Sequence, residues 1–143
     1  MELLSQADRD RIVTTARSLL KPRVVFRPYG RDPLLGLDCI GVILWVGKQC
    51  KMLPQDLDFI YAYPPQREVF EMFDHHAIRV EKPNRGSLVI FTYDGETPRH
   101  TGICEFADGK WKSIGIDVQS HRPWVTMTPI ETRMVWAYYD FVP

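Results

Sequence analysis

The sequence predicts a single α+β domain in which helices come first and an antiparallel sheet follows. Apolar residues recur at helical spacing in the first half of the chain, whereas short apolar runs bounded by turn residues fill the second half. The chain has 143 residues, of which 45% are hydrophobic, so it is long enough to bury one substantial core. We therefore expect residues 1–143 to form one domain.

The first half is expected to hold helices separated by a long loop. Ser5 and Asp8 form a capping-box pattern, and the apolar residues behind them predict an amphipathic helix over residues 6–20. Residues 23–37 are rich in proline and glycine and are interpreted as a loop. Residues 39–50 are apolar nearly all round and do not alternate, which favours a buried central helix over a strand.

The second half changes from helical to strand patterning. A third helix is expected from Gln66 to about His76, after two prolines. Asp108-Gly109 has the composition of a two-residue hairpin turn. The predicted strands comprise residues 87–93, 100–106, 110 to about 118, and 134–141.

Composition argues against several classes of function. The 18 basic and 18 acidic residues balance, so no strong field attracts nucleic acid. No segment has the length and apolarity of a membrane span, and the N-terminus lacks the basic and apolar regions of a signal peptide. The 3 cysteines are far apart, which indicates neither a disulfide framework nor a zinc ribbon. Asp74-His75-His76 is not expected to hold a metal, because adjacent helical residues face different ways. We expect no metal and no cofactor.

The run Gly36-Leu37-Asp38-Cys39-Ile40-Gly41 places a thiol where a loop becomes an apolar helix. A helix N-terminus carries partial positive charge and favours a thiolate. Gly41 is expected to remove bulk beside the thiol. Asp38 is expected to cap the helix and to lie at the mouth of the site, where its carboxylate would bind a substrate ammonium. A buried structural cysteine is the competing interpretation of Cys39.

His100 is the histidine best placed to act with that thiol, because it is expected at a strand start beside small residues. If Asp108-Gly109 is a two-residue turn, Asp117 lies opposite His100, where its carboxylate would orient the imidazole. Ser113 and Gln119 share the parity of Asp117, so a bulge or slipped register would put one of them there instead.

Three blocks of this sequence resemble the NlpC-type cell-wall cysteine peptidases: Gly36-Leu37-Asp38-Cys39-Ile40-Gly41-Val42, Gly86-Ser87-Leu88-Val89-Ile90-Phe91 and His100-Thr101-Gly102-Ile103. The resemblance implies a papain-like α+β fold with the nucleophile helix packed on an antiparallel sheet. It implies that Cys39 is the nucleophile and that His100 is general base and acid. Ile116-Asp117-Val118 matches the family's third polar position. The implied substrates are peptide stems of bacterial peptidoglycan, commonly cut at γ-D-glutamyl to diamino-acid bonds.

The sequence departs from that family at positions that bear on specificity. Ile40 follows the cysteine where the family usually has serine. Phe26 aligns with a tyrosine that stabilises the oxyanion, and we expect Tyr29 to substitute for its hydroxyl. The backbone N–H of Cys39 is a second expected oxyanion donor.

An aliphatic residue after the cysteine and an aromatic C-terminal strand resemble the phage-borne branch of the family. The resemblance therefore implies a cysteine peptidase carried in a phage tail, or a related particle, with tail hub or baseplate proteins as partners. It would be made in the host cytoplasm and act at the bacterial cell wall. Two alternatives stay open: an inactive papain-like component of a tail tip, and an intracellular thiol amidase or acyltransferase.

Overall fold

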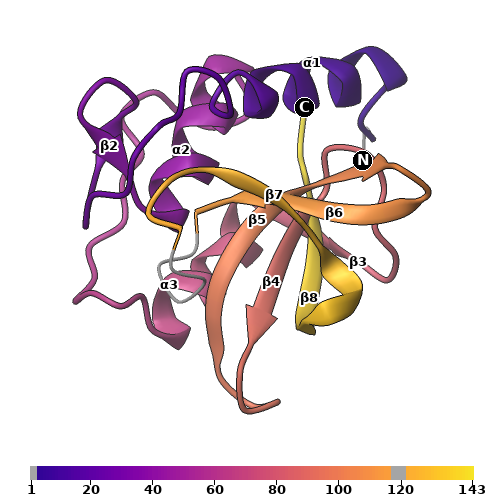
Figure 1. Cartoon of the computed structure of the whole chain (residues 1–143). Helices are drawn as coiled ribbons and strands as arrows, with labels where there is room; N and C mark the ends of the chain where they lie inside the picture. The colour runs from indigo at the N-terminus through magenta and orange to yellow at the C-terminus, as the bar shows by residue number, and fades with distance from the viewer. Residues whose placement is uncertain (1–2, 117–121) are drawn as a thin grey trace.

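The computed structural model describes residues 3–116 and 122–143. Its centre is a strongly curved, six-stranded antiparallel sheet (Figure 1). In spatial order the strands are β3 (Ala77–Val80), β8 (Met134–Phe141), β4 (Leu88–Thr92), β5 (Pro98–Ala107), β6 (Lys110–Gly115) and β7 (Thr126–Pro129). The predicted α+β class is confirmed.

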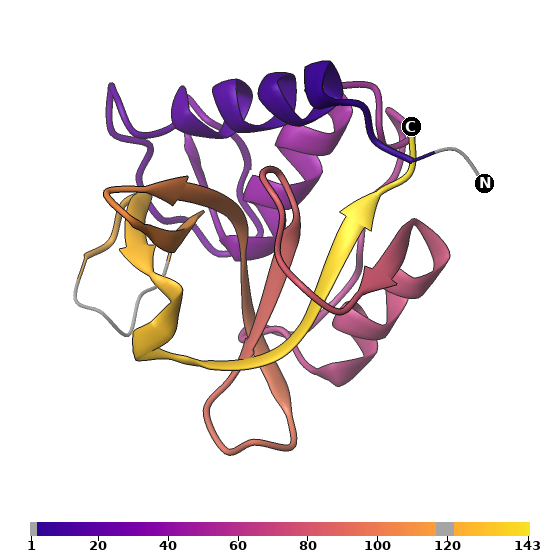
Figure 2. The same ribbon diagram turned by 90° about the vertical axis from the view of Figure 1, so that its right-hand side faces the viewer.

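Two helices cover one side of this sheet. α1 (Gln6–Arg17) lies along one end of the molecule, and α2 (Cys39–Gln49) lies between α1 and the sheet (Figure 2). This position explains why α2 is apolar nearly all round, since 8 of its 11 residues are buried. A small two-stranded sheet, β1 (Arg31–Asp32) with β2 (Gly36–Leu37), forms within the segment expected to be a loop.

The first helix starts as predicted but ends earlier. Ser5 and Asp8 form the reciprocal capping box. The expected end at residue 20 is wrong, because the N–H groups of Leu19 and Leu20 bond to carbonyls three residues back. This tighter bonding closes the helix as a 3₁₀-type turn.

The third helix is shorter than expected and is followed by a strand that the sequence did not predict. α3 (Arg67–Glu71) passes into the 3₁₀ helix η1 (Met72–His75), and β3 follows at once. The Tyr139 hydroxyl donates a hydrogen bond to Asp74 at 2.8 Å, which ties η1 to β8. Strand β7 was also missed, and it pairs with β6 at the sheet edge.

The β5–β6 hairpin confirms the two-residue turn. Ala107 pairs with Lys110, and the turn residues Asp108 and Gly109 have φ values of 54° and 78°. Positive φ at both turn positions is the type I′ geometry that suits the twist of a hairpin. β5 begins at Pro98 rather than at the predicted His100.

The sheet buries apolar residues on both faces. The larger cluster joins α1 and α2 to Leu88, Ile90, Ile103 and other residues of one face. The smaller cluster holds Val89, Phe91, Cys104 and Ile130, the last from the 3₁₀ helix η3 (Ile130–Thr132). No helix in the described part of the chain is long and apolar enough to cross a membrane.

Candidate active site

Cys39 is the first residue of α2, as the sequence predicted, and its side chain is 4% exposed. The first N–H groups of a helix have no partner within the helix, and the helix dipole places partial positive charge there. The helix N-terminus therefore acts in favour of the thiolate form of Cys39, whereas the burial of the side chain acts against it.

Asp38 caps this helix from a fully buried position. Its Oδ1 accepts hydrogen bonds from the Gly41 N–H at 2.8 Å and from the Arg31 guanidinium at 3.1 Å. Its Oδ2 accepts from the Tyr29 N–H at 2.9 Å and from the Tyr61 hydroxyl. Burial and the bond to Asp38 raise the pKa of Tyr61 well above its usual value.

These four hydrogen bonds test the two roles that the sequence predicted for Asp38. The N-cap is confirmed, but the carboxylate does not lie at the mouth of the site, since it is 0% exposed. Its cationic partner is Arg31, which also contacts Asp58 at 2.9 Å. In this structure the Arg31 guanidinium thus binds the carboxylate that we expected to bind a substrate ammonium. Ammonium binding by Asp38 stays a prediction.

Gly41 serves a purpose different from the expected one. A Cβ on Gly41 would lie 2.1 Å from the carbonyl oxygen of Gly30. The missing side chain therefore makes room for the loop that precedes the helix, and that loop carries the Tyr29 N–H and Arg31 onto Asp38.

Residues 24–27 connect the start of α2 to the start of β7. On one side Leu37 exchanges backbone hydrogen bonds with Val25 and Arg27, at 2.9 and 3.0 Å. On the other side the N–H of Phe26 donates to Pro123 and the carbonyl of Val24 accepts from Val125, each at 2.9 Å. The N-terminal end of α2, where Cys39 lies, is thereby tied to the far edge of the sheet.

The two expected oxyanion residues differ in what they offer. The Phe26 ring is half-buried and packs edge-on against Tyr63, so this residue contributes packing and backbone bonds. The Tyr29 side chain is exposed, and its hydroxyl accepts the Tyr63 N–H at 2.7 Å. A hydroxyl that accepts one hydrogen bond still has its own proton to donate.

His100 lies near the start of β5, the strand against which α2 packs. Its side chain is 4% exposed, and its ring stacks on Phe91 with centroids 5.6 Å apart and planes 15° apart. A Cβ on Gly115 would lie 3.8 Å from its Nε2, so β6 leaves space beside the imidazole.

The described residues test part of the prediction for a third polar residue beside His100. The observed pairs in the hairpin follow the predicted register from Ala107–Lys110 to Ile103–Ile114. Asp117 and Gln119 lie outside the described residues. Ser113 pairs with Cys104, and among the described residues its Oγ has no hydrogen-bond partner, so it does not orient His100 through a hydrogen bond.

The other two cysteines are also buried and unpaired by disulfides. Burial, with a smaller contribution from Asp140, raises the pKa of the Cys104 thiol far above its usual value. Cys104 therefore stays protonated at neutral pH. Cys50 ends α2, and its Sγ lies 3.5 Å from the Thr15 hydroxyl.

Comparison with known proteins identifies the fold. No protein-family model matches the chain, and no curated protein matches it in sequence. A Staphylococcus aureus protein of the NLP/P60 family superposes with a TM-score of 0.64 and 16% identity over 99% of this chain. A Bacillus cereus NlpC/P60 family protein superposes with a TM-score of 0.65 and 19% identity over 94% of this chain. The chain has the NlpC/P60 fold.

The share of each known protein that the match covers differs from one protein to the next. The chain covers 44% of the Staphylococcus aureus protein and 40% of the Bacillus cereus protein, so it spans less than half the length of either. The NlpC/P60 domain of the peptidoglycan hydrolase SagA has a TM-score of 0.57 and 19% identity over 92% of this chain, and 97% of that domain is covered. Within the NlpC/P60 fold, this chain carries Cys39 at the start of the central helix and His100 on the strand beside it.

Sequence reasoning missed two groups of residues around the site. Arg31 and Tyr61 hold Asp38, and Arg133 lies with threonines beside His100. Neither group has a local sequence pattern, because each is assembled from segments far apart in the chain.

Proposed function

We propose that this chain is a cysteine hydrolase that cleaves the peptide stems of bacterial peptidoglycan. The observation that carries the proposal is the pair of Cys39, at the first position of a buried helix, and His100, on the strand against which that helix packs in an NlpC/P60 fold.

The chemistry follows from those two groups. His100 takes the thiol proton, and the Cys39 thiolate attacks the carbonyl carbon of the scissile amide. The backbone N–H of Cys39 and the Tyr29 hydroxyl are the donors available to the oxyanion. The imidazolium then protonates the leaving amine, and water hydrolyses the thioester to regenerate the thiol.

Mass spectrometry of purified peptidoglycan incubated with the protein tests this proposal. The wild-type protein should release stem-peptide fragments, Cys39→Ala should release none, and Cys50→Ala is the matched control that should keep activity. Cleavage by Cys39→Ala would refute the assignment of the nucleophile.

Alkylation separates the proposed enzyme from the two alternatives. Iodoacetamide at neutral pH should label Cys39 ahead of Cys50 and Cys104, and His100→Ala should slow that labelling. Equal labelling of the three thiols, with no cleavage, would favour an inactive structural component. Selective labelling without cleavage of peptidoglycan would favour an amidase or acyltransferase with another substrate.

Delivery by a phage tail is the finer part of the proposal. It is supported by the resemblance of Ile40 after the cysteine, and of the aromatic last strand, to the phage-borne branch. Mass spectrometry of purified particles tests it: peptides of this chain should copurify with tail hub or baseplate proteins. Their absence from intact particles would refute this localisation without affecting the proposed chemistry.

A further inference from the structure

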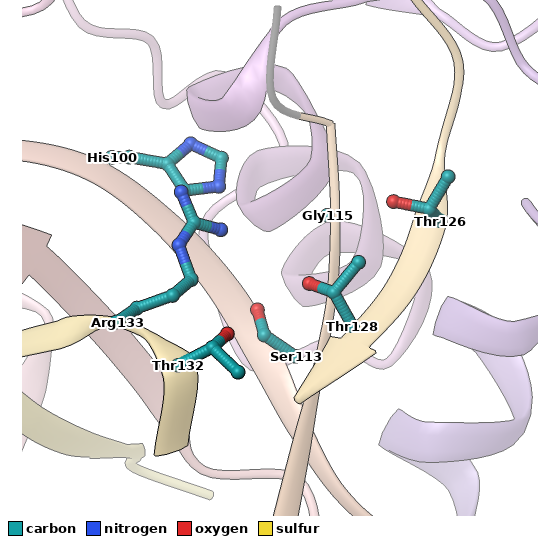
Figure 3. A pocket seen from close by; sticks show the side chains of 7 residues that line it. All are labelled: His100, Ser113, Gly115, Thr126, Thr128, Thr132 and Arg133. Carbon is teal, nitrogen blue, oxygen red and sulfur yellow. The ribbon is translucent and has the colours of Figure 1, made fainter. Parts of the chain in front are cut away.

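A polar pocket of about 200 Å³ lies beside His100, between β6, β7 and the segment that leads into β8 (Figure 3). Its walls carry hydroxyl groups and one guanidinium, from Ser113, Thr126, Thr128, Thr132 and Arg133. The pairs Ser113–Thr128 and Gly115–Thr126 of the β6–β7 ladder place these residues on one face of the sheet. Gly115 contributes no side chain, which leaves the pocket open toward His100.

Ser113 is the first sign that the pocket takes a ligand. Its side chain is 2% exposed, and among the described residues its Oγ has no hydrogen-bond partner. Buried hydroxyl groups in folded proteins are nearly always hydrogen-bonded, so an unsatisfied one needs an explanation. Figure 3 shows this hydroxyl pointing into the space between Arg133 and Thr128.

The charge of the pocket is the second sign. Arg133 lies with its Cζ 4.3 Å from the centroid of the Phe91 ring, and Phe91 also stacks on His100. The ring thus holds the guanidinium on the same side of the sheet as the imidazole. None of the described residues that line the pocket is acidic. A guanidinium fork flanked by hydroxyl donors matches the geometry of a carboxylate.

The position of the pocket shows which part of a substrate reaches it. In the proposed reaction His100 protonates the leaving amine, so the fragment that carries this amine lies against the imidazole. The pocket shares His100 with that reaction. We propose that it binds a free carboxylate on the amine-side residue of the scissile bond, with Arg133 as the cation and Ser113 as a hydroxyl donor. This inference rests on the proposed hydrolase function for its orientation.

Paired substrates test the proposal. The pair is γ-D-glutamyl-diaminopimelate and the same dipeptide with the side-chain carboxylate of diaminopimelate amidated. Wild-type protein should show a KM about tenfold lower for the free acid. Arg133→Gln should raise the KM for the acid by about tenfold and leave that for the amide within twofold, because a charge-assisted hydrogen bond is lost only from the acid. Arg79→Gln, on β3 above Trp136, is the matched control and should change neither.

A binding measurement keeps this test separate from hydrolysis. Diaminopimelate and lysine are titrated into Cys39→Ala and followed by NMR, and diaminopimelate should bind at least tenfold more tightly. Adding Arg133→Gln should remove the difference, and adding Ser113→Ala should weaken diaminopimelate about threefold without lowering the midpoint of urea unfolding. If no peptide is cleaved but this preference is seen, the pocket stands and the hydrolase function fails. Equal binding of the two amino acids, or an equal effect of Arg133→Gln on the acid and the amide, would overturn the pocket.

Discussion

Asp38→Ala tests whether the buried network around the helix N-terminus stabilises the fold. The carboxylate accepts four hydrogen bonds, from Gly41, Tyr29, Arg31 and Tyr61. Alanine removes all four at once and leaves the donors without their acceptor. Because α2 is the central helix and its cap is fully buried, we expect the loss to destabilise the whole domain.

The magnitude follows from two overlapping contributions. Loss of an N-cap side chain costs about 1 kcal/mol. Removing one partner of a buried ion pair costs about 3–5 kcal/mol, but Arg31 keeps its contacts with Asp58 and the Gly30 carbonyl, which reduces this second contribution. We therefore expect Asp38→Ala to lower the free energy of unfolding by about 4 kcal/mol. Domains of this kind have about 5–15 kcal/mol in total, so the loss is a large fraction.

Urea unfolding followed by circular dichroism measures this effect, and Asp32→Ala is the matched control. Asp32 is an exposed aspartate at the end of β1, and its Oδ1 accepts one hydrogen bond, from the Leu34 N–H at 2.9 Å. Its loss should cost no more than about 0.5 kcal/mol. Asp38→Asn should fall between the two, since the amide keeps one acceptor oxygen but presents an NH₂ group to donors. If Asp38→Ala were no more destabilising than Asp32→Ala, the importance assigned to this network would be refuted.

Two further predictions concern the sheet. Burial alone would raise the pKa of Glu105, but hydrogen bonds from Arg85 and Arg17 outweigh burial and lower the pKa. The stabilisation of the fold by the Glu105 carboxylate is therefore fully present above the unfolded pKa of about 4.3, and it is lost as the pH falls through the lower folded pKa. Urea unfolding at pH 7, 5, 4 and 3 should show a steeper loss for the wild type than for Glu105→Gln, and parallel curves would contradict this. Gly102→Ala should cost about 2 kcal/mol by overpacking, since its Cβ would lie 2.0 Å from the Ser113 Oγ. The cost should shrink in a Ser113→Gly background, and an unchanged cost would show that the hydroxyl is not the obstacle.

The sequence predicted best those features that neighbouring residues determine. The capping box at Ser5 and the type I′ turn at Asp108-Gly109 each depend on a few consecutive residues, and both occur as expected. The turn also fixes the register of the hairpin, so the pairing of β5 with β6 followed from it. Cys39 at the first position of α2 was predictable for the same reason, since Asp38 is a strong cap and the apolar run begins at once.

Features that depend on distant partners were missed. β3 is a short edge strand whose pairing with β8 joins residues about sixty positions apart, and Ala77–Val80 has no strong strand pattern of its own. The third helix was expected to run to about His76, directly before this strand. In the structure Asp74 bonds instead to Tyr139, and the chain turns into the strand.

The same distinction explains the site. Asp38 was recognised as a cap from local sequence, but its burial depends on Arg31 and Tyr61, which approach it from separate loops. Arg133 lies beside His100 only because β8 and β5 both pair with β4. A sequence pattern identifies a thiol and an imidazole that suit hydrolysis. Which charges surround them depends on the folded arrangement.

The segment of residues 24–27 shows how the fold couples these parts. It was expected to be a loop, yet its backbone bonds join Leu37, two residues before Cys39, to Pro123 and Val125 at the start of β7. α2, which carries Cys39, and β7, which lines the pocket beside His100, are therefore positioned by one short stretch of backbone. The proposed binding of substrate beside β7 and the proposed attack by Cys39 would depend on the same hydrogen bonds. Phe26→Pro removes the N–H that donates a hydrogen bond to the Pro123 carbonyl. This substitution should weaken the binding of diaminopimelate and lower the rate of peptide cleavage.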